Sequence, residues 1–283
     1  QHLDNTVLKE TKRDMKIEQV AQVTERLRNA GLKVVYHMMP NLPGSTVERD
    51  IEMFGELFSG EDFQPDMLKV YPCMVLEGSE LFQIWQAGGF KPYTDEELFR
   101  VLVGAKKQVP KYVRIIRVIR DIPATYIQAG SKISNLRQWL FDDMKKNDWH
   151  CVCIRCREVR GAVVDLEKFP LTTTEYRTKT GREMFLSFES SPSPALSGSK
   201  VGEGKLAAFL RLRLPDNRGE EFVGGPLEVL RDAALVRELH TYGQLTPIGT
   251  AGTQSQHIGF GRRLLIEAER IARAAGYKKL AVI

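Results

Sequence analysis

The sequence lacks any apolar run that approaches the roughly 18 residues needed to cross a bilayer, so we expect no membrane span. Its first residues carry neither the basic region nor the apolar region of a signal peptide. Cysteine is also scarce, with 4 in 283 residues. This usage indicates a reducing compartment, and we expect a cytoplasmic protein.

Charge of one sign is in small excess, because 41 Lys and Arg stand against 36 Asp and Glu for a net charge of +5. Such a surplus is compatible with an anionic partner but is also common in proteins that bind none. Hydrophobic residues make up 42% and charged residues 27%, which are ordinary proportions for a globular protein with a substantial core. The length predicts about two domains.

The first part of the chain alternates helix and strand signals. Thr94 with Glu97, and Ser45 with Glu48, have the spacing of a capping box at a helix start. We expect helices at 15–30, 45–58, 94–109 and 134–147, and strands at 33–39, 67–72 and 113–119. Repeated strand–helix–strand units predict an α/β fold with a parallel sheet, open or closed as a barrel. Its chemistry is expected at the carboxyl ends of the strands.

From Gly161 onward the pattern changes to shorter strands. Residues 184–188 and 206–214 resemble two arms of a hairpin, with leucines alternating against Arg211 and Arg213. A Ser-, Pro- and Gly-rich loop, 190–204, connects them. A strand at 234–247, an amphipathic helix at 261–275 and a strand at 279–283 follow.

Three cysteines lie within six residues as Cys151-x-Cys153-x-x-Cys156, a spacing suited to ligands folded round one ion. Zinc prefers four thiolate or imidazole ligands, and the fourth is expected to be Cys73 or His150. An iron–sulfur cluster is the chemical rival, since the same thiolates suit it. Three reduced cysteines without a metal are the remaining alternative.

A glycine motif, Gln-x-x-Gly-x-Gly, stands between a strand and the helix at 261–275. Glycines let the backbone approach a pyrophosphate, and free N–H groups at a helix start supply an anion site. Acyl-CoA-binding acetyltransferases of the GNAT superfamily use this context, although a plain helix start with permissive glycines is the alternative. The candidate acetyl-CoA residues are Leu245, Thr246, Gln256, His257, Ile258, Gly259, Phe260 and Gly261.

Glu238, His240 and Tyr242 alternate along the strand before this motif and share one of its faces. They are candidates for a catalytic base or proton donor, with ordinary packing as the alternative.

Several motifs then follow one another in a distinctive order. These are residues 37–44, 68–72, 117–123, 157–159 and 236–243, followed by the glycine motif. Over essentially the whole chain, this order closely resembles the catalytic subunit of Elongator in its bacterial or archaeal single-protein form. The resemblance implies part of a radical S-adenosylmethionine (SAM) barrel at 1–125, a zinc-binding linker at 126–160 and a GNAT-type domain of α+β fold, C-terminally incomplete, at 161–283.

The reaction implied by the resemblance converts the wobble uridine of a tRNA anticodon to 5-carboxymethyluridine. In the family, a 4Fe-4S cluster cleaves SAM to a radical that activates the methyl group of acetyl-CoA for addition to the base. The uridine must be reachable, which a splayed anticodon loop provides.

The resemblance also implies roles for individual residues. Lys69 is a catalytic candidate beside Glu238, His240 and Tyr242. The SAM contacts are expected at Gln1, His37, Asn41 and Tyr71. The tRNA anticodon stem-loop is expected to meet Arg114, Arg117, Arg120, Lys132 and Arg137, although scattered basic residues are more often a solvated face.

Two motifs of the family are expected beyond this sequence. The cluster-binding cysteines would precede Gln1 and a tyrosine-bearing segment would follow Ile283, so we expect a piece of a longer protein. A protein lysine acetyltransferase is the alternative function, because a GNAT fold normally serves an amine. A zinc-stapled RNA-binding scaffold without catalytic activity is the third hypothesis.

Overall fold

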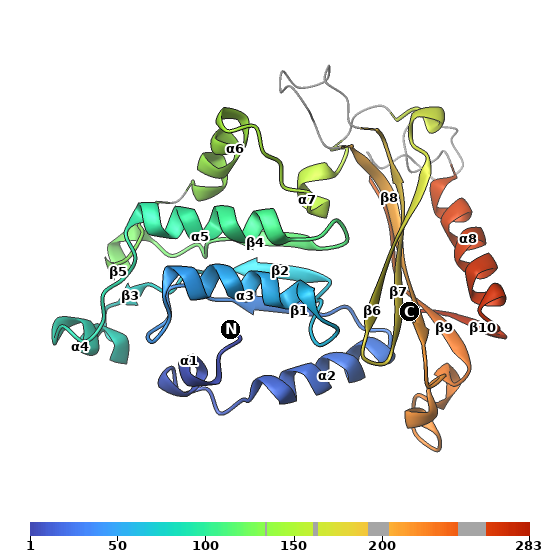
Figure 1. Ribbon diagram of the computed structural model, residues 1–283, viewed down its shortest axis with the longest axis horizontal. Coiled ribbons are helices and arrows are strands. Elements are labelled where there is room, and N and C mark those ends of the chain that lie inside the picture. The colour runs from blue at the N-terminus through green and yellow to red at the C-terminus, as the bar shows by residue number, and fades with distance from the viewer. Residues whose placement is uncertain (134, 161–163, 192–203, 243–258) are drawn as a thin grey trace. The chain divides into compact units, whose positions relative to one another are not determined.

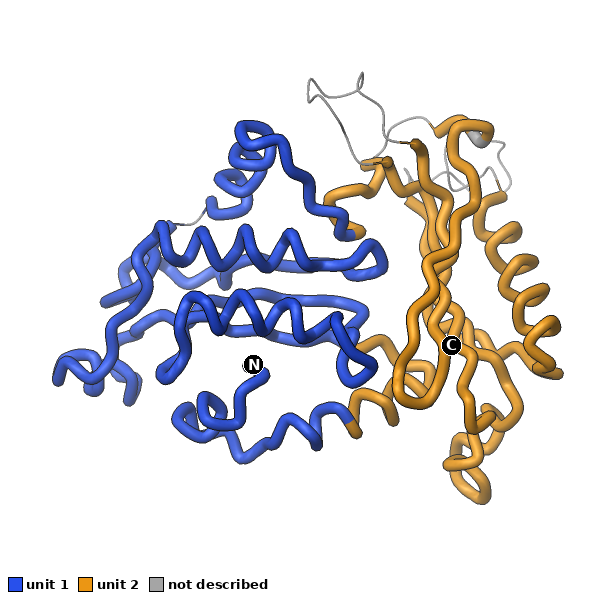
Figure 2. The backbone as a smooth tube through the Cα atoms, in the orientation of Figure 1, with its two compact units in different colours: residues 1–21, 35–153 blue, residues 22–34, 154–283 orange. Residues whose placement is uncertain are grey.

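The chain divides into two compact units in the computed structural model, which describes residues 1–133, 135–160, 164–191, 204–242 and 259–283. The first unit comprises 1–21 and 35–153, and the second comprises 22–34 and 154–283 (Figure 2). The second unit therefore includes a short segment from near the start of the chain, 22–34. The predicted division at 1–125, 126–160 and 161–283 assigned that segment to the first domain. None of the described helices is long and apolar enough to span a membrane.

The first unit is built on a parallel sheet in the order β1-β2-β4 (Figure 1). Its strands are β1 (Val35–Met38), β2 (Met67–Val70) and β4 (Arg114–Val118), close to the ranges expected from the sequence. The crossovers run through α3 (Val47–Ser59) and α5 (Asp95–Gln108), which pack against each other. This confirms the α/β prediction for the first part of the chain.

Smaller elements complete the first unit. They are α1 (Asn5–Glu10), the beginning of α2 (Ile17–Asn29), α4 (Glu80–Gln86), α6 (Leu136–Lys146) and an antiparallel pair formed by β3 (Val75–Leu76) and β5 (Ile127–Ala129). The capping box of Thr94 and Glu97 is present at the start of α5, as predicted. The predicted capping box of Ser45 and Glu48 is wrong, because Thr46 caps α3 and the Ser45 hydroxyl bonds Asp50 instead.

The second unit holds a five-stranded sheet in the order β10-β9-β8-β7-β6. The strands β6 (Leu171–Thr178), β7 (Gly181–Glu189), β8 (Leu206–Pro215) and β9 (Ala233–Thr241) are antiparallel, whereas β10 (Lys279–Val282) pairs parallel to β9. The predicted hairpin is thus confirmed as β7–β8, and β6 is an additional strand. The expected strand at 234–247 reaches Thr241 in β9, and residues 243–258 lie outside the described part.

One face of this sheet packs against α8 (Phe260–Ala274). The rings of Phe260 and Phe188 lie 4.4 Å apart, and Leu264, Ala268 and Ala272 are buried along the same side of the helix. Their spacing matches the apolar stripe of an amphipathic helix, so burial of this stripe explains why the segment is helical. A short helix, α7 (Ile154–Arg157), precedes the sheet.

Buried charge distinguishes the opposite face of the sheet. Arg211 and Arg213 on β8 are only 1% and 0% exposed, although their alternation with leucines would suit a solvated face. Glu183 on β7 accepts hydrogen bonds from Arg213 Nη1 at 2.9 Å and from Arg237 Nη2 at 3.0 Å. A buried carboxylate thus binds two buried guanidinium groups.

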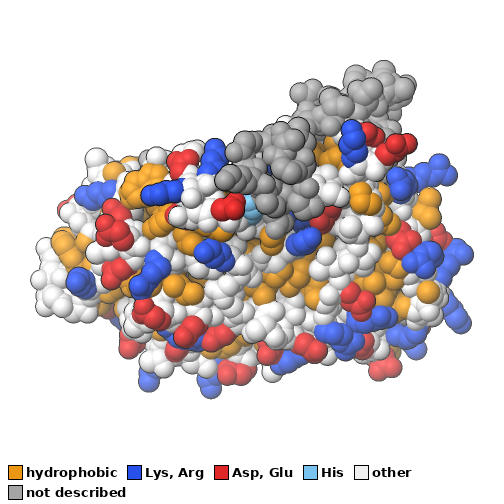
Figure 3. Space-filling model, turned by 45° about the horizontal axis from the view of Figure 1, so that its top comes forward, with side chains coloured by type: hydrophobic (Ala, Val, Ile, Leu, Met, Phe, Trp, Pro, Cys, Tyr) orange, Lys and Arg blue, Asp and Glu red, His pale blue; other side chains and the backbone are white. Residues whose placement is uncertain are grey.

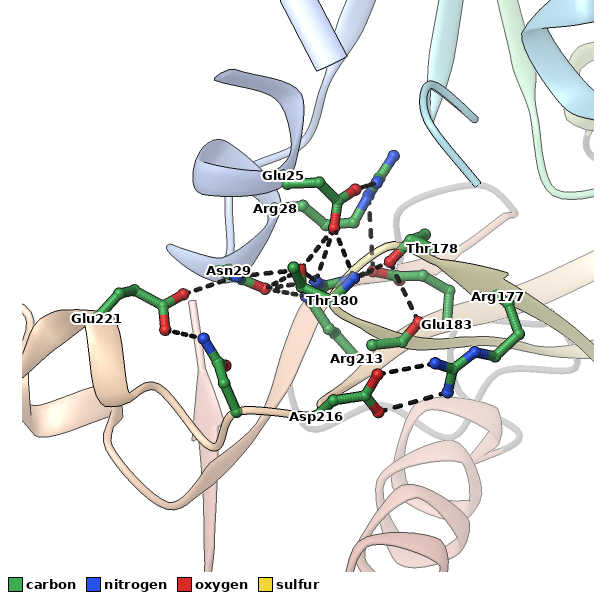
Figure 4. Close-up of polar contacts among 12 residues, drawn as sticks. Glu25, Arg28, Asn29, Arg177, Thr178, Thr180, Glu183, Arg213, Asp216 and Glu221 are labelled. Atoms are coloured by element: carbon green, nitrogen blue, oxygen red, sulfur yellow. Dashed lines mark hydrogen bonds and ion pairs between the residues drawn. The ribbon is translucent and has the colours of Figure 1, made fainter. Parts of the chain in front are cut away.

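The end of α2 joins this network from a distant part of the sequence (Figure 4). Arg213 also donates to the side chain of Asn29, and Glu25 accepts from the Thr180 hydroxyl at 2.6 Å. Arg28 is fully buried and pairs with Glu25. These charge-assisted bonds hold the segment 22–34 against the sheet of the second unit.

The network predicts a large loss of stability for Glu183→Gln. The substitution leaves the buried Arg213 and Arg237 without their shared countercharge, and breaking a buried pair costs about 3–5 kcal/mol. Urea unfolding measures the change. Glu175→Gln is the matched control, because that carboxylate is 45% exposed in its pair with Arg182 and its loss is expected to cost less than about 0.5 kcal/mol. Equal effects of the two variants would contradict this role of Glu183.

Candidate functional site

Three predicted site residues form a row across the parallel sheet of the first unit. The register pairs His37 with Lys69, and Lys69 with Arg117, so these three side chains share one face of neighbouring strands. Tyr71 follows β2, and its ring meets the His37 ring edge-on at 5.7 Å. Burial, followed by the charge of Lys69, lowers the pKa of His37, which favours the neutral imidazole.

Asn41 lies beyond the carboxyl end of β1 in a left-handed conformation, with φ +67°. Its side-chain amide donates to the Cys73 carbonyl at 3.0 Å, and its Oδ1 accepts from the Tyr93 backbone N–H at 3.0 Å. Both polar ends of this 4% exposed side chain are therefore bound to backbone. The structure gives Asn41 a role in holding the loops at the strand ends, and the contact with SAM stays a prediction.

Asp50 is the centre of a buried polar cluster that the sequence analysis missed. Its carboxylate accepts from the Asn41 N–H at 2.7 Å, the Ser45 hydroxyl at 2.7 Å and the Tyr93 hydroxyl at 2.8 Å, and it contacts His2 Nε2 at 3.0 Å. Burial and the charge of Asp50 raise the pKa of Tyr93, so the hydroxyl stays protonated as a donor. The missed signal was a carboxylate on the otherwise apolar face of α3, where only a partnered charge is stable.

The other predicted residues of the first unit lie in separate segments of the chain. Gln1 is exposed, and its carbonyl accepts the Met39 N–H at 2.8 Å. Arg117 forms an ion pair with Asp121 at 2.9 Å, Arg114 lies within β4, and Arg137 is half-buried in α6. On the face drawn in Figure 3, basic and acidic side chains are interspersed. The structure thus disperses the predicted tRNA-binding residues, and their contact with tRNA stays a prediction.

Arg120 and Lys132 meet at a pocket of about 370 Å³ beyond the carboxyl end of β4. Its lining residues are Met74, Ile119, Arg120, Asp121, Ile122, Pro123, Ala124, Ile127, Ser131, Lys132 and Ile133. Ile119 has φ +70°, which is a strained conformation for a β-branched residue. Such strain gathers at functional sites, so this strand end is a candidate binding region.

The sulfur atoms of Cys151, Cys153 and Cys156 lie within 4.8 Å of one another. Sulfur ligands of a tetrahedral zinc ion are about 3.8 Å apart, given Zn–S bonds of about 2.3 Å, so three thiolates fit such an ion. Cys151 and Cys153 are buried, which would exclude water from two of the ligands. This group could hold a metal.

Cys73 does not belong to this group of potential ligands, nor does His150. Cys73 instead packs in a small apolar cluster with Val7 and Leu42. Cys73 thus lies outside the three-cysteine group in this structure, and its role as the fourth ligand stays a prediction.

Metal analysis distinguishes the two kinds of cysteine. We expect Cys153→Ala to lower the bound metal by at least about tenfold, since removing a ligand or even its supporting partner weakens metal sites to that extent. Cys73→Ala is the comparison variant, because Cys73 lies outside the three-cysteine group. The metal content is measured by inductively coupled plasma mass spectrometry. Metal loss in both variants would identify Cys73 as the fourth ligand, and retention in Cys73→Ala would exclude it.

The reactivity of Cys73 is predicted to be low. Burial, followed by the charge of Asp50, raises the pKa of this thiol to about 11. The nucleophilic thiolate is therefore nearly absent at pH 8, and alkylation by iodoacetamide should be at least about tenfold slower than in the urea-unfolded chain. Mass spectrometry of the modified peptide measures both rates, and similar rates would contradict the burial of this thiol.

In the second unit, Glu238 and His240 stand on one face of β9. Glu238 accepts from Arg211 Nε at 2.9 Å and is paired with Lys33 at 3.3 Å, so two cations engage its carboxylate. The exposed His240 ring lies 4.4 Å from the ring of Tyr242 and 5.8 Å from that of Phe209. The structure therefore groups the three predicted catalytic residues, with His240 the most accessible and Glu238 held in ion pairs.

The described part of the glycine motif forms the start of α8. Gly259 has φ +80° as the N-cap, a conformation that favours glycine. Gly261 needs no such freedom, and a Cβ there would meet only ordinary contacts at 3.8 Å or more. The Phe260 side chain is buried in the core, so only the backbone of this residue is available to a ligand. The predicted residues Leu245, Thr246, Gln256, His257 and Ile258 lie outside the described part.

Comparison with known proteins bears on both units. Residues 65–146 match the family model of the Radical_SAM C-terminal domain. The "tRNA uridine(34) acetyltransferase" of Methanocaldococcus jannaschii is 42% identical over 100% of this chain and 51% of its own length. The protein of the same name from Dehalococcoides mccartyi is 41% identical over 100% of this chain and 60% of its own.

Eukaryotic relatives and a solved structure agree with this. Human "Elongator complex protein 3" is 36% identical over 98% of this chain and 49% of its own length. An Elp3 from Methanocaldococcus infernus, solved with an N-terminal deletion, matches with a TM-score of 0.85 and 42% identity over 100% of this chain and 65% of that one. The chain spans about half the length of the curated relatives it matches first. The chain is thus a close homologue, along its whole length, of the archaeal tRNA uridine(34) acetyltransferases and of Elongator complex protein 3.

Proposed function

We propose that the whole protein is an acyltransferase that uses acetyl-CoA and radical SAM chemistry to form 5-carboxymethyluridine at the wobble position of tRNA. The observation that carries the proposal is the 42% identity over the entire chain to proteins named for action on tRNA uridine 34. The reduced thiols of Cys151, Cys153 and Cys156 suit the cytoplasm, where we place the reaction. The ion that they hold is proposed to be zinc.

The second unit is proposed as a GNAT-type domain that binds acetyl-CoA at the start of α8. Gly261 supports this, because neither its backbone conformation nor packing in the described part accounts for glycine at this position. Close approach of a pyrophosphate to the backbone would account for it. The N–H groups of the first helical turn would then donate to the phosphates, since they lack partners within the helix.

The first unit is proposed to hold SAM at the carboxyl ends of its strands, with contacts from Gln1, His37, Asn41 and Tyr71. When bound, SAM and a 4Fe-4S cluster would supply the radical chemistry of the proposed reaction, and the residues of this unit would bind and orient SAM. The resemblance to the Elongator catalytic subunit implies that the cysteines holding this cluster precede Gln1, so we do not assign Cys73 or the three-cysteine group to it.

Charge and proton transfer in this proposal rest on a few side chains. Lys69 stands between His37 and Arg117 and would orient an anionic or carbonyl oxygen on this face of the sheet. In the second unit, the accessible His240 would move a proton during thioester hydrolysis. Glu238 would position Arg211 and not act as a base, since two cations hold its carboxylate.

Acetyl-CoA hydrolysis tests the function directly. The full-length protein is expected to hydrolyse acetyl-CoA at least about tenfold faster with tRNA than without it. The reason is that general acid–base groups accelerate the reaction only when both substrates are bound in the reactive orientation. Release of free CoA is measured with a thiol reagent, and a histone peptide replaces tRNA in the control. A rate unchanged by tRNA would contradict the proposal, and stimulation by the peptide would favour a lysine acetyltransferase.

Calorimetry with desulfo-CoA tests the cofactor site. Gly261→Trp places a bulky side chain where the backbone is proposed to meet the pyrophosphate, and we expect affinity to fall by at least about tenfold. Ile266→Trp on the same helix is the matched control, because Ile266 is 56% exposed and lies beyond the first turn. Unchanged affinity in Gly261→Trp would remove the start of α8 from the cofactor site.

A further inference from the structure

The pocket beyond the carboxyl end of β4 is lined by apolar side chains together with four polar or charged residues, Arg120, Asp121, Ser131 and Lys132. Met74, Ile122, Pro123 and Ile127 are among its lining residues, and its volume of about 370 Å³ falls in the range of small-ligand sites, about 300–1,000 Å³. Ser131 is 5% exposed, which places a hydroxyl among these apolar walls. Such a cavity fits a flat heterocycle that has few polar atoms at its edges.

The charges at this pocket select the kind of molecule that carries the heterocycle. Arg120 and Lys132 are exposed, and no ion pair or hydrogen bond joins either side chain to another residue that the structure describes. The one acidic lining residue, Asp121, is neutralised by its ion pair with Arg117 at 2.9 Å. The pocket therefore presents two cations without a bound countercharge, which attract a phosphate.

We infer that this pocket receives one unstacked base of the RNA loop, with the adjoining phosphate held between Arg120 and Lys132. Bases splayed from a single-stranded loop are recognised in apolar or aromatic pockets, while cations fix the backbone. The inference rests on the proposed function for its RNA, and adds a base-binding subsite to it. In this arrangement the strained backbone of Ile119 turns the chain after β4, so that the following residues surround the base.

Filling the pocket tests the inference in the full-length protein. Ala124 is an exposed lining residue, so Ala124→Phe would occupy the cavity without entering the core. The affinity for an anticodon stem-loop, measured by fluorescence anisotropy, should fall about tenfold, since loss of one base contact has an effect of this order. Thr125→Phe is the matched control, because Thr125 is exposed on the same turn and does not line the pocket.

A second measurement identifies the base. Stem-loops with a single abasic nucleotide are titrated against the wild type and Ala124→Phe. At the position that enters the pocket, the abasic change and Ala124→Phe should not add, because both remove the same contact. Additive effects at every position of the loop would overturn the inference.

The phosphate contact has its own readout in the salt dependence of binding. Because Arg120 and Lys132 hold the same phosphate, the double variant Arg120→Gln/Lys132→Gln should reduce the slope of log affinity against log salt by about 0.7, the value for one phosphate of a single strand. Lys91→Gln, at an exposed lysine outside the pocket, should leave the slope unchanged. If Ala124→Phe proves poorly folded by circular dichroism, these slopes decide the matter.

The failures can be told apart. A wild-type protein that does not bind the stem-loop would overturn the proposed function, whereas wild-type binding with unaffected Ala124→Phe and unchanged slopes would overturn the pocket alone. Loss of SAM affinity in Ala124→Phe, with RNA affinity retained, would assign the pocket to the adenosyl group of SAM and also overturn the inference.

Discussion

The second unit depends on one buried carboxylate, that of Glu183, which binds Arg213 and Arg237 inside the sheet face. A single guanidinium group in this environment would be strongly destabilising, and the shared carboxylate makes two of them tolerable. Their remaining N–H groups reach Asn29 and the carbonyl of Leu32, so the same arginines also hold the segment 22–34. Charge thus fixes a connection that apolar packing, which has no direction, would leave loosely specified.

The first unit uses the same device on a smaller scale. Asp50 bonds the loop after β1 through Asn41 and the segment before α5 through Tyr93. The first of these segments follows the strand that carries His37, and the row of His37, Lys69 and Arg117 runs across β1, β2 and β4. A buried carboxylate that accepts several hydrogen bonds therefore fixes the chain on which the proposed SAM and RNA contacts depend, without being placed to touch either molecule.

The proposed functions are divided between the two units. Parallel strand ends in the first unit offer cations, an imidazole and a pocket for a base, whereas the helix start in the second unit offers backbone N–H groups and small residues for a pyrophosphate. Each arrangement suits one of the two substrates that the proposed reaction must combine. Between them in sequence lies the three-cysteine group, which could hold a metal.

The sequence by itself determined the periodic elements and the local motifs. The parallel strands, α5 with its capping box, the β7–β8 hairpin, α8 and the three-cysteine group all follow from spacing within a few residues. Only the tertiary structure decided where distant residues meet. It placed Cys73 in an apolar cluster outside the three-cysteine group, buried Arg211 and Arg213, and brought Asp50 to His2 and Tyr93. The reason is that period and spacing report which side of an element a residue occupies, whereas a partner for a buried charge comes from another segment whose position depends on the whole fold.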